Sequence, residues 1–212
     1  MSTRYYLIRH GETEWNRDGN RYCGRSDICL SPRGADQAEQ LAVYLQHVPL
    51  DRVYASTLRR AYDTAGPLAH TKGLPIVRDA RAAEIDFGLW EGLRSPEISD
   101  KHAEAWAAWQ STPESHPAGL TGETAGQVYG RMRELLLETA DRHPGEAIAV
   151  VSHSTTLRIF LAGMLGMPLS RYRSMGMDNI GISVVETEEG EFRLHHHNLI
   201  PGFGVPEAIA DN

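Results

Sequence analysis

The sequence predicts a three-layer α/β/α sandwich around a mostly parallel sheet, because short apolar runs alternate along the chain with helical segments. Strands are expected over residues 4–9, 52–55, 74–77 and 147–152. A hairpin pattern across residues 180–197, with its turn at Gly190, adds an antiparallel edge strand. The chain of 212 residues shows no linker and no internal repeat, which favours a single domain over residues 1–212.

The predicted helices carry recognisable signals at their ends. Ser31 and Pro32 begin the first, since serine caps an N-terminus and proline fits the first turn, and Pro49 ends it. Further helices are expected over residues 58–71, closed by Gly73, from Thr121 or Thr124 to His143, and over 155–165. Each helix lies between two strands in the sequence, as a parallel crossover requires.

Residues 94–122 are the best candidate for a cap inserted over a site. Ser95, followed by a proline, begins one predicted helix that carries Trp106 and Trp109, for which core packing is the simplest role. The stretch after Thr112 contains two prolines and two glycines and is predicted to be irregular.

The composition argues against several classes of partner. A net charge of −7, with 41% hydrophobic and 23% charged residues, is typical of a globular protein and leaves no broad basic face for nucleic acid. No apolar run approaches the roughly 18 residues that span a bilayer, and no signal peptide is evident, so we expect no membrane association and a cytoplasmic location. Cys23 and Cys29 form neither a zinc pattern nor a disulfide framework. A homodimer is the default expectation.

Titratable and cationic residues follow each predicted strand. They are Arg9 and His10 after the first, Arg59 and Arg60 after the second, Glu84 in a loop after the third, and His153 after the fourth. The carboxyl ends of parallel strands share one edge of a sheet, and ligands bind at that edge. We therefore expect these side chains to converge.

This set suits phosphoryl transfer without a metal or a cofactor. A neutral imidazole such as His10 attacks phosphorus and carries the phosphoryl group covalently. Arginines such as Arg9 and Arg60 grip phosphate oxygens and keep their charge. The leaving alkoxide needs a proton, which Glu84 can supply, and His153 adds a donor.

Other kinds of site have less support. The chain has no Walker loop, no Gly-x-Gly-x-x-Gly and no Gly-x-Ser-x-Gly elbow, which argues against nucleotide binding and serine hydrolysis. No metal site is predicted, because the three histidines of 195–197 would alternate between the faces of a strand and cannot meet at one ion. Within the acid loop, Asp86 and Glu91 are alternatives to Glu84.

Four blocks of sequence resemble the motifs of one family, in that family's order. They are LIRHGET at 7–13, STLRRA at 56–61, EIDFGLWEG at 84–92 and VVSH at 150–153. On these blocks the chain is similar to the histidine phosphatase superfamily, in its phosphoglycerate-mutase-like branch. The resemblance spans residues 5–165 and implies a phosphoglycerate-mutase-like fold.

The resemblance implies a role for each matching residue. His10 would become phosphorylated and Glu84 would donate the proton to the leaving group. The phosphate pocket would consist of Arg9, Arg60 and His153. Ala61 fixes the register within the arginine pair, so that Arg60 is favoured over Arg59.

Four further residues are expected to contact substrate. Asn16 would be an additional phosphate contact, although an Asx turn explains it nearly as well. Ser154 stands where many family members carry a glycine, which changes the floor of the pocket. Tyr22 and Cys23 lie where relatives line the substrate mouth.

These residues favour a metal-independent phosphatase that hydrolyses a small phosphorylated metabolite through a phosphohistidine. The first alternative is a cofactor-dependent phosphoglycerate mutase, whose acid loop runs into an Asn-Lys that this chain lacks after Gly92. The second is a phospho-ligand-binding module without turnover, against which the intact set of candidate catalytic residues argues. Phosphoserine, phosphoglycerates, sugar phosphates and a cobalamin-pathway nucleotide phosphate all occur as substrates among similar proteins.

Overall fold

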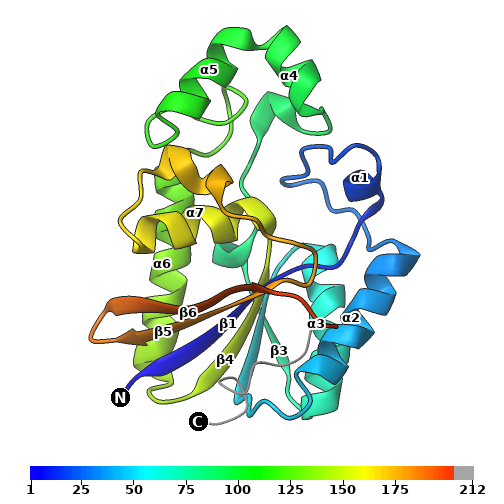
Figure 1. Cartoon of the computed structure of the whole chain (residues 1–212), viewed down its shortest axis with the longest axis vertical. Coiled ribbons are helices and arrows are strands. Elements are labelled where there is room, and N and C mark those ends of the chain that lie inside the picture. Colours follow the sequence, from blue (N-terminus) through cyan, green and yellow to red (C-terminus); the bar gives the residue numbers. More distant parts are fainter. Residues whose placement is uncertain (203–212) are drawn as a thin grey trace.

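The computed structural model describes residues 1–202 and is built on a six-stranded sheet in the order β3-β2-β4-β1-β5-β6 (Figure 1). The strands are β1 (Thr3–Arg9), β2 (Arg52–Ser56), β3 (Ile76–Asp79), β4 (Ala147–Ser152), β5 (Ile182–Glu188) and β6 (Glu191–Leu199). The first four are parallel, β5 runs antiparallel to β1, and β6 pairs with β5 at the edge. The predicted fold class is confirmed. Residues 203–212 of the predicted domain lie outside the described part.

Helices cover both faces of the sheet (Figure 1). On one face lie α2 (Pro32–Tyr44) and α3 (Arg59–Lys72), and on the other α6 (Ala125–Arg142) and α7 (Ser154–Met164). The predicted signals operate at the helix ends, because the Ser31 side chain accepts a hydrogen bond from the Gly34 amide and Gly73 ends α3 in the left-handed conformation. A single-turn helix, α1 (Glu14–Arg17), follows β1.

β1 shows how the sequence builds the two cores. Tyr6 and Ile8 point into the apolar cluster under α2 and α3, whereas Tyr5 and Leu7 point into the cluster under α6 and α7. All four side chains are at most 2% exposed. Burying a large apolar side chain contributes about 1.5–3 kcal/mol. Burial on both faces therefore stabilises this strand in the interior of the sheet, and the position of the strand fixes that of His10 at its end.

Residues 94–122 form α4 (Ser95–Lys101), α5 (Ala103–Ser111) and an irregular stretch, beyond the carboxyl ends of the strands (Figure 1). The single helix predicted from Ser95 is wrong, because the backbone at His102 has φ −135° and ψ 41° and separates two helices. Trp109 is fully buried in a third apolar cluster, together with Trp90 and Ile98. Its predicted packing role is confirmed.

The third strand lies two residues later than predicted. Gly73 and Leu74 donate their backbone N–H groups to the carbonyl oxygens of His70 and Ala69, and these bonds cap α3. In this Schellman motif the backbone N–H of Leu74 is bonded to the end of α3, so it is not available to a strand. The strand therefore begins at Ile76, after Pro75.

Candidate active site

The predicted edge of the sheet brings the two histidines together. Arg9 at the end of β1 is paired with Ser152 at the end of β4, so the residues that follow them, His10 and His153, emerge side by side. Their ring centroids are 5.1 Å apart. His10 lines a cavity of about 250 Å³, which also contains Glu84. The two rings therefore meet, as predicted, although His153 and Arg60 are not among the residues that line this cavity.

His10 is held as a neutral imidazole with one nitrogen available. Its Nδ1 lies 2.6 Å from the carbonyl oxygen of Gly11, which can only accept, so Nδ1 carries the proton. Burial, together with the positive charges of Arg60 and Arg9, lowers the pKa of His10 well below the usual 6.5. Nε2 consequently keeps the lone pair that attack on phosphorus requires.

A glycine after His10 is required by the packing of the loop. A Cβ atom at Gly11 would lie 2.5 Å from the carbonyl oxygen of Gly34 at the start of α2. A Cβ at Gly34 would lie 2.0 Å from the carbonyl oxygen of Glu12. These two glycines let the His10 loop touch α2 backbone to backbone, and Thr64 of α3 accepts a hydrogen bond from the Gly11 amide at 2.9 Å.

Arg60 and His153 are fully buried, and neighbouring groups fix their orientation. Arg60 donates to three carbonyl oxygens in the loop at residues 23–26, at 2.8–3.1 Å. The Nε2 atom of His153 lies 2.8 Å from Ser56 Oγ at the end of β2. Arg60 therefore ties the predicted substrate-mouth loop to α3, a role that the sequence did not predict.

Each of the three predicted phosphate-binding residues keeps a free nitrogen. Within residues 1–202, Nε of Arg9, Nε of Arg60 and Nδ1 of His153 are buried and have no hydrogen-bond partner. A buried donor left without a partner costs about 1–3 kcal/mol. Burial, Arg60 and His10 lower the pKa of His153 well below 6.5, so this ring is also neutral near pH 7. Each of these nitrogens can still take up a hydrogen-bond partner.

Glu84 is buried and fixed against the start of α7. Its Oε1 accepts from the amides of Ile85 and Thr156 and from the Thr156 hydroxyl, at 2.9–3.0 Å. Its Oε2 accepts only from the Thr155 amide, at 3.1 Å. Oε2 therefore keeps a lone pair for a further hydrogen bond. Asp86, one of the two alternative acids, is placed differently. It accepts a hydrogen bond from the Gly88 amide and does not line the cavity.

Glu91, the other alternative acid, supports the mouth loop. Its carboxylate accepts hydrogen bonds from the backbone amides of Gly24 and Ser26. The same loop gives its carbonyl oxygens to Arg60. The Glu91 carboxylate therefore binds the amide groups of the loop, and the Arg60 guanidinium binds its carbonyl groups.

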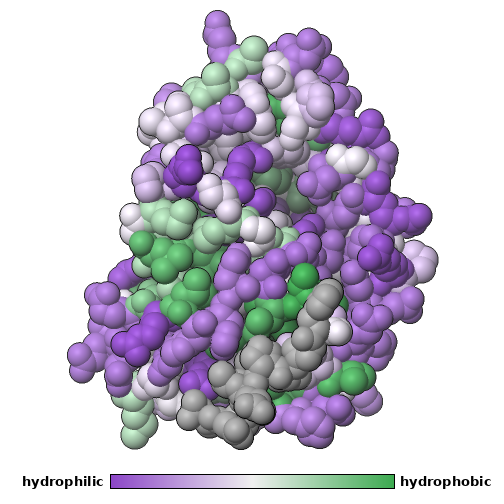
Figure 2. All heavy atoms as spheres, in the orientation of Figure 1, coloured by the Kyte–Doolittle hydropathy of each residue, from purple (hydrophilic) through white to green (hydrophobic). Residues whose placement is uncertain are grey.

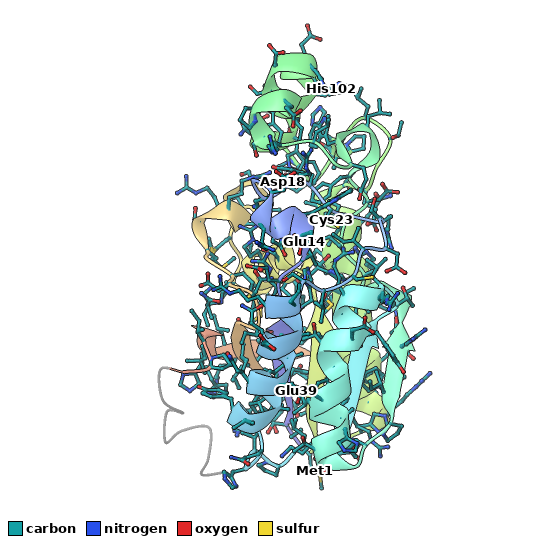
Figure 3. The ribbon with its side chains drawn as sticks, turned by 90° about the vertical axis from the view of Figure 1, so that its right-hand side faces the viewer. Met1, Glu14, Asp18, Cys23, Glu39 and His102 are labelled. Carbon is teal, nitrogen blue, oxygen red and sulfur yellow. The ribbon has the colours of Figure 1, made fainter. Side chains whose placement is uncertain are left out.

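All four of the predicted substrate contacts line the cavity. Asn16 forms a capping box rather than the Asx turn that was the alternative, because its Oδ1 accepts from the amide and hydroxyl of Thr13, three residues earlier. Burial raises the pKa of the Cys23 thiol to about 12, which keeps it protonated. Ser154 begins α7, and Tyr22 packs edge-on against Phe87 with centroids 4.7 Å apart. In Figure 3, Asp18 and Cys23 lie between His102 and Glu39 of α2.

Several cavity residues escaped the sequence analysis. The lining also includes Thr13, Asn20, Arg21, Phe87, Ser95, Thr155, Arg158, Arg173 and Met177. Arg158 lies within α7, and Arg173 lies in a short 3-10 helix, η3 (Leu169–Ser174). In a chain whose basic residues are all arginine except for Lys72 and Lys101, one more arginine carries little signal.

The described residues offer neither a cluster of metal ligands nor a membrane-spanning helix. No three His, Cys, Asp or Glu side chains in residues 1–202 are arranged to hold a metal ion. In the same part of the chain, every helix is too short or too polar to cross a bilayer.

Comparisons with known proteins identify the family of the chain. A model of the histidine phosphatase superfamily (branch 1) matches residues 5–200. Phosphoserine phosphatase 1 of Hydrogenobacter thermophilus is 39% identical over 209 residues, covering 92% of this chain and 98% of that protein. Probable phosphoglycerate mutase GpmB of Cronobacter sakazakii is 31% identical, covering 87% and 85%.

A solved structure gives the same result. The phosphoserine phosphatase of Entamoeba histolytica, in complex with 3-phosphoglyceric acid, matches with a TM-score of 0.84 at 30% identity, covering 93% of this chain and 97% of that one. The match over residues 5–200 and the shared fold place this chain in the histidine phosphatase superfamily.

Proposed function

We propose that the protein is a metal-independent phosphatase that hydrolyses a small phosphomonoester through a phosphohistidine at His10. The observation that carries this proposal is the neutral ring of His10, which lies 5.1 Å from the ring of His153, together with the buried nitrogens of Arg9, Arg60 and His153 that lack a partner within residues 1–202. A phosphoryl group has oxygens to satisfy each of them. Arg9 and Arg60 supply fixed positive charge where the phosphoryl oxygens would lie, which is the electrostatic work that a metal performs elsewhere.

In the first step, Nε2 of His10 attacks phosphorus and the bond from phosphorus to the alcohol oxygen breaks. Protonated Glu84 gives its proton, from Oε2, to the departing oxygen. In the second step, water attacks the phosphohistidine, Glu84 accepts a proton from that water, and the bond from phosphorus to nitrogen breaks. Inorganic phosphate leaves, and both residues return to their starting states.

The substrate proposed first is phosphoserine, because two of the matching relatives are named phosphoserine phosphatases. We also propose that residues 94–122 cap the cavity. Ser95 lines it, and Trp106 packs edge-on against Tyr22 with centroids 6.0 Å apart. This contact joins the segment to the mouth of the site.

The nucleophile is tested with phosphoserine carrying a radioactive phosphate. Acid quenching of the wild-type protein should trap label on the chain, and His10→Ala should remove both the label and turnover. His47→Ala, at an exposed position, is the matched control. Circular dichroism checks that each variant is folded. Turnover retained by His10→Ala, or lost from the wild type in EDTA, would contradict the proposal.

A mutase is the second candidate, because one matching relative is named a probable phosphoglycerate mutase. The test supplies 3-phosphoglycerate with and without 2,3-bisphosphoglycerate, and measures 2-phosphoglycerate and free phosphate. Phosphate release that exceeds isomerisation supports the phosphatase. Faster isomerisation supports the mutase, and binding of phosphoserine without either reaction supports a module without turnover.

A further inference from the structure

Two arginines in the cavity have no role in the phosphoryl chemistry. Arg158 and Arg173 line the same cavity as His10, and neither forms an ion pair within the described residues 1–202. Arg21 lies in the same lining, but Asp18 neutralises it. Glu84, the one acid among the lining residues, is bound to α7. The cavity lining therefore holds two positive charges beyond that of Arg9.

Both side chains are held in place. Arg158 donates from Nε to the carbonyl oxygen of Ser154, at 3.2 Å, and its guanidinium lies 5.4 Å from the ring of Tyr172. Its two Nη groups donate to nothing in the part of the chain that the structure describes. Arg173 donates to the hydroxyl of Tyr22 at 2.9 Å and lies 5.1 Å from the ring of Trp106. These contacts orient the two cations without neutralising either.

The positive charges of Arg158 and Arg173 repel each other within the cavity. Burial lowers the pKa of Arg158, and the positive charge of Arg173 lowers it further. An anion bound between them would relieve this repulsion and receive charge-assisted hydrogen bonds from the free guanidinium nitrogens. Arg9 and Arg60 already serve the phosphoryl group, so this anion is a second group.

We propose that Arg158 and Arg173 form a second anion subsite, which binds a carboxylate or a second phosphate on the alcohol part of the substrate. The proposal rests on the proposed function, since the phosphoryl group is taken to sit at His10. It narrows the substrate class to phosphomonoesters with a further anionic group. Arg158 and Arg173 select the substrate and take no part in the chemical steps.

Matched substrates separate the two sources of the anion. 3-Phosphoglycerate and glycerol 3-phosphate differ only in a carboxylate that replaces a hydroxymethyl group. Fructose 1,6-bisphosphate and fructose 6-phosphate differ in a second phosphate. The wild-type protein should prefer the more anionic member of at least one pair by tenfold or more in kcat/KM, and that pair identifies the anion.

The variants are Arg158→Gln and Arg173→Gln, with Arg171→Gln in η3 as a matched control, because Arg171 is exposed and absent from the cavity lining. Each of the two cavity variants should lower kcat/KM for the preferred anionic substrate by about tenfold to a hundredfold, as expected for lost hydrogen bonds to a charged group. Turnover of its less charged partner should change less than twofold. The control should retain the wild-type preference.

A purely structural role gives a different result. If Arg173 only ties Tyr22 to Trp106, its loss lowers the melting temperature and weakens both members of a pair equally. If both variants weakened the two substrates of a pair equally, or if the wild type preferred neither substrate of either pair, the proposed subsite would be overturned. Failure of the proposed function is distinct, because His10→Ala would then leave phosphate release intact whatever the substrate preference.

Discussion

At the scale of single residues, the proposed function gives the same two charges two roles, in phosphate binding and in activation of the nucleophile. Arg9 and Arg60 lower the pKa of His10, and each keeps a buried nitrogen free for substrate. The bound dianion would offset their charge, so the ring is neutral before attack and gains positive character only as the bond to phosphorus forms. Burial alone would lower the pKa of His10, but it would provide no positive charge to bind the dianion.

The role of Glu84 predicts a dependence on the leaving group. Glu84→Gln should lower kcat by about 10²–10⁴-fold with phosphoserine, whose alkoxide needs a proton, because general acids contribute this much. With p-nitrophenyl phosphate the loss should be at least tenfold smaller, since that phenolate departs without a proton. Steady-state kinetics with both substrates measures the difference.

The control for this prediction is Asp86→Asn, in the same loop. Asp86 caps Gly88 and does not line the cavity, so its variant should affect both substrates equally. If Glu84→Gln slowed the two substrates to the same extent, the proton-donor role would fail.

The sequence predicted the phosphate pocket because its residues follow buried strands. His10 and His153 come after runs whose burial on both faces of the sheet is visible in the sequence, and the structure places their rings 5.1 Å apart. Arg158 and Arg173 come from a helix and a 3-10 turn. Their position in the cavity depends on how α7 and η3 pack, which no strand-end rule describes.

At the scale of elements, α6 holds the acid loop on both sides of Glu84. Arg131 of α6 donates to the carbonyl oxygens of Arg81 and Ala83, at 2.6 and 2.7 Å, just before Glu84. Its other nitrogens bind Glu123, whose Oε2 accepts from the Asp86 amide at 2.9 Å, just after it. The Arg131–Glu123 pair thus fixes both ends of the four-residue segment from Ala83 to Asp86.

This arrangement predicts that Arg131 is a positioning residue. Arg131→Gln should lower kcat by about a hundredfold with little change in KM, because a displacement of about 1 Å in a reacting group has this effect. The loss should be larger for phosphoserine than for p-nitrophenyl phosphate, as for Glu84→Gln. Arg133→Gln, at an exposed position on the same helix, is the control. A rise in KM alone would contradict positioning.

The contact between the His10 loop and α2 predicts a strong effect of one methyl group. Gly34→Ala should lower the melting temperature and the activity together, because the added Cβ would meet the Glu12 carbonyl at 2.0 Å. Gly66→Ala in α3 meets nothing within 4 Å and should stabilise the helix by up to about 1 kcal/mol. Thermal unfolding of both variants measures this contrast. An unchanged melting temperature in Gly34→Ala would refute the close contact.

Element boundaries were predictable where local chemistry sets them. Ser31 and Gly73 mark helix ends through side-chain and backbone capping, and both act as predicted. The edge strand β3 was misplaced because only Ile76 and Asp79 within it are even partly buried, so its pattern is weak. The break at His102 follows from the packing of α4 and α5 into their own cluster, to which the helical pattern gave no clue.

At the scale of the whole molecule, an acidic chain encloses a basic pocket. The net charge is −7, and the surface over α1 and the start of α2 is hydrophilic in Figure 2. The cavity, in contrast, is lined by four arginines and a single acid. Field focused into such a cleft attracts small anions, whereas the outer charge disfavours polyanions. This contrast suits a small phosphorylated metabolite.

The two buried, neutral histidines predict that the free energy of unfolding depends on pH. His10 and His153 titrate near 6.5 in the unfolded chain, but burial lowers both pKa values well below this in the folded protein. Below pH 6.5 the unfolded chain therefore binds more protons, and stability that is fully present above 6.5 is lost as the pH falls towards the folded pKa values.

Each such histidine should lower the free energy of unfolding by up to about 1.4 kcal/mol per pH unit below 6.5. Urea unfolding of the wild type and of a His10→Asn/His153→Asn variant, measured between pH 7.5 and 5.5, isolates this contribution as the difference in slope. His47→Asn, at an exposed site, should follow the wild type. Parallel curves for the double variant and the wild type would mean that the two rings accept protons in the folded protein, and His10 would then lose its nucleophilic lone pair at the same pH as a free histidine.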